Sequence, residues 1–569
     1  MLGLSRVAAS CLILAVALEL LVGAADRDDL DGLRPLPMND MPSVALAASI
    51  PDVVADAPLH TFRVGRVSRS ARVVKAPARL TRTVTVPRSG GYFATTISPA
   101  AQPVRITVAV EGLAPVTVAA QPERWNVVRA DLPTTTRPVR IVETLDAPRD
   151  TVVLWGDDVV VPNRRSGRAP DVIVLSLDTV RPDYLTPYTP GTSTTPVLAQ
   201  FARESMRFDQ AISVSSWTTP AHAALFTGQY PRPGLGVTER FDAAQVTLAE
   251  ILAAAGYNTQ GASGGPCIDS VFGFQQGFRA YRDSAEPKNA LAMTNWAINR
   301  VKATAPGAPF FLFLNYFDAH EVNSGVTSAE WEAAERGTVR LDGAPLEHLR
   351  AGYRFDLQTI DRQVGRLFEA LRQTRDWDNT IVVVLGDHGQ LLGERGFVGH
   401  GFSLDEELIR IPLIVKGTAS SRFAGRRYQE QFQMTDVFSL ILELAGLRRP
   451  AGPSIVERVA AGEPVRTLTF AQYHLAPGPE VTAMRRWTSQ TLEAVRTDSI
   501  KVIRDAEGRI TTYRVGDRVQ SVVPRFALTE RLLGELDRFR AQTATTAAGE
   551  RLVLPKDVVD RLRALGYIR

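Results

Sequence analysis

The sequence has only two cysteines among its 569 residues, and Cys11 lies in the apolar N-terminal segment. If that segment is removed, Cys267 is left alone, which excludes an internal disulfide. Cys267 lies in the segment GGPCIDS without a neighbouring histidine or other base, so we assign it no chemistry. The sequence also lacks any run of five or six basic residues, and its net charge is only +4. Nucleic-acid binding therefore gains no support, whereas a small anionic substrate fits this charge balance.

Long apolar runs are equally scarce, and the chain has at most one that could span a membrane. The run VAASCLILAVALELLVGAA follows Arg6 and ends in small residues. This pattern predicts a signal peptide over residues 1–25, with cleavage near Ala24 or Ala25. Because the run is close to the roughly 20 residues that cross a bilayer, an uncleaved anchor is the alternative. Both interpretations predict export, to the periplasm, to the cell exterior or to the outer face of a membrane.

The first half of the chain is rich in short strands. Residues 26–58 contain many Asp, Pro and Ala residues and are predicted to be a linker. Alternating segments such as TRTVTV, VRITVAV and WNVVRADL then recur with Gly, Pro and Thr between them, which predicts a β-sandwich domain over residues 59–162. This region resembles galactose-binding-like jelly rolls, and we expect Trp125 and Trp155 to be core residues rather than sugar-stacking ones. A basic linker, residues 163–170, follows.

From Asp171 the pattern changes to apolar runs separated by helical stretches such as TPVLAQFARES and AAQVTLAEILAAAG. Strands that alternate with helices predict an α/β/α sandwich, here over residues 171–450. Residues 451–569 return to short strands and end in helical segments, which predicts a small antiparallel sheet in a C-terminal subdomain packed on the main sheet.

Acids and imidazoles follow three of the apolar runs. Asp178 follows VIVLSL, Asp318 and His320 follow FFLFLNYF, and Asp387 and His388 follow IVVVLG. In an open α/β sheet, ligands bind beyond the carboxyl ends of the strands, so these side chains are predicted to meet at one edge. Such residues are typical metal ligands, which favours an enzyme.

The segment SSWTTPAHAALFTGQYP carries a candidate nucleophile. Thr218 and Thr219 precede Pro220 at the predicted start of a helix, where proline is well tolerated. An ordinary helix cap is the alternative role for either threonine. However, a helix N-terminus also attracts a phosphate or sulfate group. A cation held by Asp178, Asp387 and His388 would activate the Thr218 hydroxyl beside that group.

Five segments resemble the sulfatase family of the alkaline phosphatase superfamily: DVIVLSLDTVRPDYL, TTPAHAALFTGQYP, PFFLFLNYFDAH, NTIVVVLGDHGQLLGE and GHGFSLDEELIRIPLIV. The resemblance implies an alkaline-phosphatase-like α/β fold and assigns roles by position. It implies metal ligation by Asp178, Asp387 and His388, a nucleophile at Thr218, and substrate or proton-transfer roles for His222, His320 and His400.

The departures from that family bear on specificity. Sulfatases carry a cysteine or serine that is converted to formylglycine at the position of Thr218, and threonine cannot form that aldehyde. Thr179 stands where many sulfatases have another acidic ligand, and GASGGPCIDS stands where they have a Lys-x-His sulfate clamp. The T-x-P-x-H pattern is closer to that of nucleotide pyrophosphatase/phosphodiesterases. The ligand types suit Mn, Zn or Ca, and Asp318, His320 and His400 could hold a second ion. Arg181 is a further residue that could bind the substrate anion, and because it precedes Pro182 in a turn-like segment, a surface or structural role is the alternative.

The sequence thus predicts an exported, metal-dependent hydrolase of phosphate or sulfate esters that acts through a covalent Thr218 intermediate, with His222, His320 or His400 protonating the leaving group. The expected partner is a small-molecule or glycan ester, with no nucleic acid and no membrane contact beyond an N-terminal anchor. Two alternatives stay open. One is a transferase that passes the phospho group to an acceptor alcohol, and the other is a carbohydrate-binding protein that has lost turnover.

Overall fold

The computed structural model of the chain describes residues 34–35 and most of 60–564. Within 60–564 the residues outside the described set are 65–66, 85–90, 123, 134, 136, 150, 157–158, 163–168, 233–234, 236–238, 242–244, 285–288, 305–307, 321–340, 448–453, 475–490, 517–520, 526, 544–553 and 555. The expected signal or anchor at 1–25, nearly all of the linker at 26–58 and most of the linker at 163–170 therefore lie outside it. The chain forms two compact units: one contains residues up to 167 with the stretches 256–258 and 278–282, and the other contains the rest.

The first unit is built from antiparallel strands. One sheet has the order β4 (Ala78–Val84), β9 (Val139–Asp146), β6 (Val104–Val110) and β7 (Val116–Ala120). The other paired strands of this unit are β1 (Arg34–Pro35), β2 (His60–Val64), β3 (Val67–Lys75), β5 (Gly91–Pro99), β8 (Asn126–Leu132), β10 (Val152–Gly156), β11 (Val159–Pro162) and β15 (Ala280–Arg282). Burial alternates along β6 and β9, as expected for strands with one face on a core.

Trp155 belongs to that core, as the sequence predicts. Its side chain is fully buried, and its indole N–H lies 3.1 Å from Thr95 Oγ1 and 3.2 Å from Glu143 Oε2. A buried indole usually finds such polar partners. Trp125 is half-buried and packs near Ala71 and Leu154.

The second unit contains a mixed sheet with the order β14 (Asn258–Ala262), β16 (Phe310–Tyr316), β12 (Asp171–Leu177), β17 (Thr380–Gly386), β20 (Arg410–Lys416), β13 (Met206–Ile212) and β21 (Arg426–Gln433). Strand β12 pairs in parallel with both β16 and β17, whereas β20 runs antiparallel to its two neighbours. Every residue of β12, β16 and β17 is buried. This explains their continuous apolar runs, because strands covered on both faces need no polar side.

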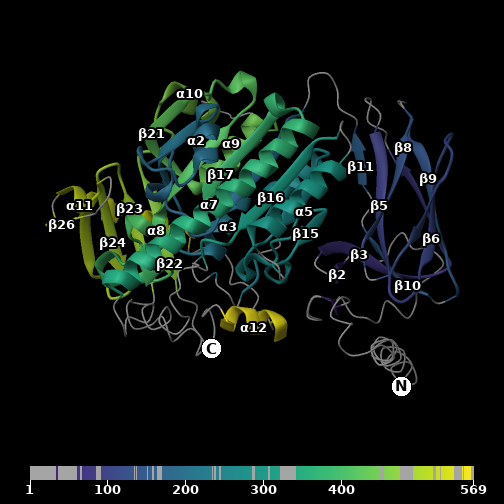
Figure 1. Cartoon of the computed structure of the whole chain (residues 1–569), viewed down its shortest axis with the longest axis horizontal. Helices are drawn as coiled ribbons and strands as arrows, with labels where there is room; N and C mark the ends of the chain where they lie inside the picture. Colours follow the sequence, from purple (N-terminus) through teal and green to yellow (C-terminus); the bar gives the residue numbers. More distant parts are fainter. Residues whose placement is uncertain are drawn as a thin grey trace. The chain divides into compact units, whose positions relative to one another are not determined.

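Helices cover both faces of this sheet. Helices α2 (Pro196–Arg203), α5 (Ala290–Ala303) and α7 (Gly343–Thr374) share one hydrophobic cluster with the odd-numbered residues of β12 and the even-numbered residues of β16. Figure 1 shows α5 and α7 side by side, and α5 packs on β16. Helix α3 (Thr218–Thr227) contacts the opposite face, since His222 reaches Ser176 of β12 and Phe226 packs on Phe313 of β16. Helices α4 (Leu248–Ala254) and α9 (Met434–Leu444) contact α3, and α10 (Ile455–Ala461) contacts α9.

Helix α7 begins earlier than the sequence suggests. The stretch 321–349 has no readable motif and is expected to be a substrate loop, yet residues 343–349 form the first turns of α7. Pro345 lies in the first turn, where its missing N–H costs nothing. Residues 321–340 lie outside the described set.

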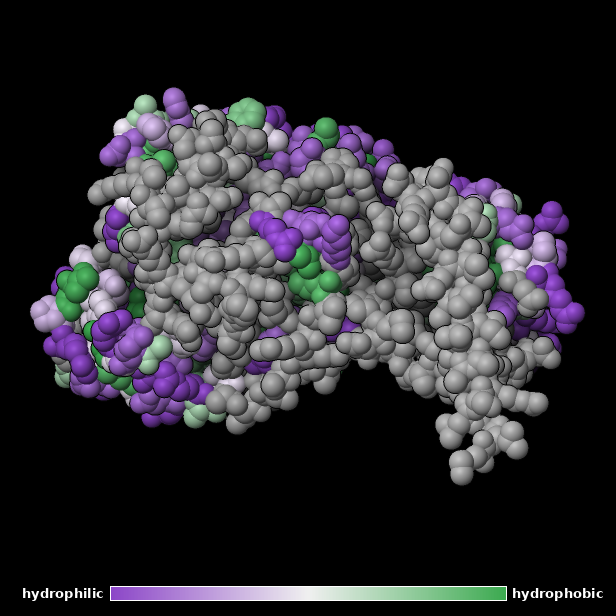
Figure 2. Space-filling model, turned by 90° about the horizontal axis from the view of Figure 1, so that it is seen from below, coloured by the Kyte–Doolittle hydropathy of each residue, from purple (hydrophilic) through white to green (hydrophobic). Residues whose placement is uncertain are grey.

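The C-terminal region contains the expected small antiparallel sheet, with the order β22 (Thr469–His474), β23 (Thr491–Arg496), β24 (Ile500–Asp505), β25 (Ile510–Arg514) and β26 (Ser521–Val523). Helix α11 (Ala527–Thr543) packs on it through Leu532, Leu536 and Phe539, and α12 (Lys556–Ala564) follows. Figure 2 shows a mostly hydrophilic surface at the left end, where this sheet lies, with isolated hydrophobic side chains. The elements thus form the predicted α/β fold, with a β-rich N-terminal part and a small C-terminal antiparallel sheet. No helix among the described residues is both long and apolar enough to cross a membrane.

Candidate functional site

The carboxyl ends of β12 and β17 bring three predicted ligands together. The two strands are parallel neighbours, and Leu177 pairs with Gly386, so the residues that follow them leave the sheet side by side. Ligand atoms of Asp178, Asp387 and His388 all lie within 4.8 Å of one another, and all three side chains are buried. The cluster therefore follows directly from strand register.

Neighbouring groups orient the two carboxylates. The backbone N–H groups of Thr179 and His388 donate to Asp387 Oδ1 at 3.1 and 2.8 Å, and Asn315 Nδ2 donates to Asp178 Oδ2 at 3.3 Å. Asp178 Oδ1 and Asp387 Oδ2 have no hydrogen-bond partner among the described residues. Burial, together with the charge of Asp387, raises the pKa of Asp178 well above its usual range, although the Asn315 bond opposes this.

The His388 ring presents an acceptor to the same place. Its Nδ1 lies 2.9 Å from the carbonyl oxygen of Gly389, and because a carbonyl only accepts, Nδ1 carries the proton. In the neutral ring, Nε2 then has a lone pair, and it lies 3.3 Å from Asp387 Oδ2. Two buried carboxyl groups and an imidazole lone pair form a donor set that fits a divalent cation.

Thr218 lies next to this set as the first residue of α3. Its Oγ1 is 3.3 Å from His388 Nε2, so the hydroxyl donates toward the ring. Trp217, the residue before it, is extended, and all ten residues of α3 are buried. The hydroxyl is thus placed at a helix N-terminus, where backbone N–H groups and the helix dipole favour an anion. Thr219 points elsewhere and donates to the carbonyl oxygen of Cys267 at 3.0 Å.

His222 is engaged at both ring nitrogens. Nδ1 donates to the carbonyl oxygen of Thr218 at 2.9 Å, and Nε2 accepts from Ser176 Oγ at 2.9 Å. Burial lowers the pKa of His222 by more than the nearby Asp387 carboxylate raises it. This geometry favours a neutral ring that holds the start of α3, rather than the proton-transfer role predicted from the sequence.

His320 and His400 lie on the other side of His388. The ring of His400 is 4.6 Å from that of His388 and 4.8 Å from that of His320, and His320 stacks on Phe317. Both nitrogens of the buried His400 lack a hydrogen-bond partner among the described residues. Burial, and then the two neighbouring imidazoles, lowers the pKa of His400. His400 can therefore turn either nitrogen toward a bound group.

Asp318 does not lie with these histidines in a metal-binding group. Its Oδ1 accepts from the backbone N–H of Ala290 at the start of α5 at 3.0 Å, and the described residues contain a single cluster with metal-ligand geometry, that of Asp178, Asp387 and His388. The expected second ion on Asp318, His320 and His400 gains no support from this arrangement.

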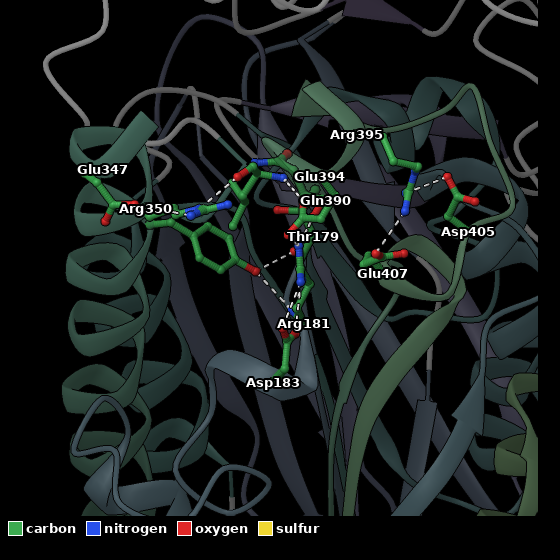
Figure 3. Close-up of polar contacts among 12 residues, drawn as sticks. Thr179, Arg181, Asp183, Glu347, Arg350, Gln390, Glu394, Arg395, Asp405 and Glu407 are labelled. Carbon is green, nitrogen blue, oxygen red and sulfur yellow. Dashed lines mark hydrogen bonds and ion pairs between the residues drawn. The ribbon is translucent and has the colours of Figure 1, made fainter. Parts of the chain in front are cut away.

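Arg181 is paired with protein groups instead of facing the cluster. Its guanidinium donates to both carboxylate oxygens of Asp183 at 3.0 and 2.8 Å, to Glu394 Oε1 at 2.8 Å and to the carbonyl oxygen of Gln390 at 3.0 Å. Figure 3 shows the side chain enclosed by these partners. Sequence reasoning cannot see such partners, because Glu394 is 213 residues away. The pairing does not favour the predicted role in binding the substrate anion.

Sequence reasoning also missed three residues that hold the site. Asn315 and Ser176 are polar positions inside buried apolar strands, a signal that could have singled them out. The third is Tyr353 of α7, whose hydroxyl contacts the turn after Asp178. In sequence it is indistinguishable from the apolar core positions of an amphipathic helix.

Comparison with known proteins gives the family. The model of the sulfatase family matches residues 170–447. This region is a sulfatase-family domain. The multifunctional alkaline phosphatase superfamily protein PehA of Trinickia caryophylli is 32% identical over 146 residues, which cover 25% of this chain and 28% of PehA. An arylsulfatase of Clostridium perfringens is 23% identical over 191 residues, which cover 28% of this chain and 40% of that enzyme.

The solved structures agree on the fold of the sulfatase-family domain. The phosphonate monoester hydrolase of Agrobacterium radiobacter superposes with a TM-score of 0.52 at 19% identity, over 66% of this chain and 96% of that one. At this identity the likeness concerns the fold. The chain spans well under half the length of the two curated relatives, so their activities bear on this protein only as proposals.

Proposed function

We propose that the protein is a metal-dependent hydrolase of sulfate, phosphate or phosphonate esters in which Thr218 is the nucleophile. The observation that carries this proposal is the position of the Thr218 hydroxyl, 3.3 Å from His388 Nε2 and at the N-terminus of α3, beside the buried cluster of Asp178, Asp387 and His388. The named activities of the relatives, an arylsulfatase and a phosphonate monoester hydrolase, support the same class of substrate.

Asp178, Asp387 and His388 would hold the cation. When bound, a Mn, Zn or Ca ion supplies positive charge that favours the threonine alkoxide and neutralises the ester. The protein's own part is to place the hydroxyl and to keep water away, since each of these side chains is at most 1% exposed. The N-terminal N–H groups of α3 would receive the non-bridging oxygens of the ester.

Thr218 then attacks the phosphorus or sulfur atom as its hydroxyl gives up a proton, and the ester oxygen leaves as an alcohol. Water later releases the group from Thr218 and restores the hydroxyl. The departing oxygen needs a proton, and we assign its delivery to His320, because the lowered pKa of His400 leaves that ring neutral. His222 serves to hold α3, because neither of its ring nitrogens is available. The substrate is a small-molecule or glycan ester, and export through residues 1–25 stays a prediction.

Matched variants of two adjacent threonines test this proposal. Wild type, Thr218→Ala and Thr219→Ala are compared on an aryl phosphate monoester, a phosphodiester, a phosphonate monoester and an aryl sulfate, with metal content determined on the same samples. Loss of a nucleophile costs on the order of 10³-fold or more in kcat, so Thr218→Ala should lose turnover with its metal retained. Thr219→Ala should stay active, because its hydroxyl bonds only a carbonyl oxygen.

The outcomes also separate the substrate classes. Phosphoester or phosphonate turnover that requires Thr218 supports the proposed mechanism. Turnover of any ester that survives in Thr218→Ala points to another nucleophile and refutes it. Product analysis with added alcohols distinguishes hydrolysis from transfer, since a transferase would depend on the acceptor.

A further inference from the structure

The turn after Asp178 has an unfavourable backbone. Thr179 has a φ of 57°, in the left-handed region, although it is a β-branched residue and is fully buried. Such a conformation costs about 1–3 kcal/mol and persists only where the surroundings hold it. Thr179 directly follows one metal-ligand candidate, so whatever holds this turn also bears on the site.

Tyr353 of α7 bonds the turn at the unfavourable residue and two residues after it. Its hydroxyl donates to the carbonyl oxygen of Thr179 at 2.8 Å and accepts from the backbone N–H of Arg181 at 3.0 Å. Burial raises the pKa of Tyr353, so the hydroxyl keeps the proton that it donates. The ring is fully buried and meets Tyr184 edge to face at 5.0 Å. A rigid helix thus fixes the path of the turn.

This turn also orients the Asp387 carboxylate. The backbone N–H of Thr179 donates to Asp387 Oδ1 at 3.1 Å, and this bond helps to leave Oδ2 directed toward His388 Nε2. A shift of the peptide at Thr179 would move both the Asp387 carboxylate and Asp178, whose carbonyl oxygen accepts from Thr179 Oγ1 at 2.7 Å. Tyr353 therefore reaches both ligands through one residue.

Arg181 joins the same turn to the segment that follows His388. Its guanidinium bonds the Gln390 carbonyl oxygen and Glu394, and Glu394 also accepts from the backbone N–H of Leu392 at 2.6 Å. Figure 3 shows Thr179 and Arg181 beside Gln390 and Glu394 in this arrangement. Arg181 therefore connects the two loops that carry the ligands, and the Tyr353 hydroxyl bonds the backbone of Arg181.

We propose that Tyr353 is a positioning residue for the metal-binding pair Asp178 and Asp387, acting through the turn at Thr179. This inference rests on the proposed metal site. Outer residues that orient metal ligands typically contribute 10–100-fold in metal affinity, although they touch neither metal nor substrate. Tyr353→Phe keeps the buried ring and removes only the hydroxyl.

A second, half-buried tyrosine provides a matched control. Tyr188 bonds a backbone segment in the same way, since its hydroxyl donates to the carbonyl oxygen of Leu413 and accepts from the N–H of Leu413, both at 2.8 Å. Leu413 belongs to strand β20, so this tyrosine does not contact the turn at Thr179. Dissociation constants for Mn²⁺, Zn²⁺ and Ca²⁺ are measured by calorimetry on wild type, Tyr353→Phe and Tyr188→Phe, with thermal unfolding of the same samples.

We expect Tyr353→Phe to bind the preferred ion about 10–100-fold more weakly, with Tyr188→Phe close to wild type even if both lose similar thermal stability. Equal affinity in wild type and Tyr353→Phe, or equal weakening in both variants, overturns the inference and leaves the metal site standing. A wild type that binds none of the three ions overturns the proposed site itself.

The same comparison in a Thr179→Gly background provides a second test and covers the case in which Tyr353→Phe alone does not fold. Glycine adopts positive φ without strain. If Tyr353 acts by holding Thr179 in place, the hydroxyl should matter less for metal affinity in that background. An undiminished effect there would contradict the route through Thr179.

Discussion

Glu406 links the C-terminal sheet to the sulfatase-family domain, and its removal should destabilise the protein strongly. It begins α8 (Glu406–Ile409) and lies 3.1 Å from Arg496 of β23 and 3.1 Å from Lys501 of β24. All three side chains are almost fully buried. Removing the carboxylate charge by Glu406→Gln would leave two buried cations without their counter-charge.

The magnitude follows from the pKa of Glu406. Burial alone would raise this pKa, but Arg496 and Lys501 lower it from its ordinary value of 4.5 to about 2. A difference of about 2.5 pKa units between the unfolded and folded states corresponds to roughly 3 kcal/mol. Because the folded pKa is depressed, this contribution is complete above pH 4.5 and is lost as the pH falls toward 2. At pH 3 less than half of it should remain.

Urea unfolding of wild type and Glu406→Gln at pH 7, 5 and 3 measures this difference in the free energy of unfolding. The exposed ion pair of Arg525 and Glu530 supplies the control, and Glu530→Gln should cost under about 1 kcal/mol at each pH. A Glu406→Gln loss no larger than that of the control, or one that is the same at pH 7 and pH 3, would refute the reasoning.

Three further results are expected. Asp361 accepts from two backbone N–H groups at the start of α2, and burial raises its pKa to about 6. Between about pH 4 and pH 6 the folded carboxyl therefore holds a proton that the unfolded one has lost. The free energy of unfolding of wild type relative to Asp361→Asn, measured by urea titration, should fall as the pH rises through this range. His222→Gln should lower kcat, because Thr218 would be misplaced, but the pH profile of kcat/KM should keep both of its limbs. Loss of one limb of that profile would instead assign His222 a proton-transfer role. Chelation should lower the melting temperature, and re-addition of the ion should restore it in proportion to the logarithm of its concentration; a melting temperature indifferent to chelator and metal would count against the site.

The ligand cluster could be predicted from the sequence because it depends on a regular feature. Buried parallel strands read as continuous apolar runs, and their carboxyl ends meet at one edge, so Asp178, Asp387 and His388 were identifiable without tertiary information. The start of a helix after Trp217 followed equally from Pro220 in the first turn.

The residues that orient the cluster depend on packing between distant segments, which local patterns do not encode. Tyr353 is 174 residues from Thr179 and looks like any apolar position of α7. For Arg181 the sequence allows either substrate binding or a surface or structural role, because its partners are set by how the segment 390–394 folds back. Asp318 likewise ends an apolar strand but caps α5. A strand-end residue thus has a predictable position, but its neighbours decide its role.

Backbone carbonyl groups fix two of the protons around the site. A carbonyl only accepts, so the proton of His388 lies on Nδ1 toward Gly389, and that of Tyr353 points to Thr179. His388 Nε2 is thereby left as an acceptor beside Asp178 and Asp387, and ligand atoms of the three residues lie within 4.8 Å of one another. Burial and the charge of Asp387 raise the pKa of Asp178, so without a cation this carboxyl tends to keep a proton that relieves the repulsion. A bound cation would take the place of that proton, because metal ligands must be deprotonated. The raised pKa of Asp178 and the proposed cation therefore have the same origin, two carboxyl groups buried side by side.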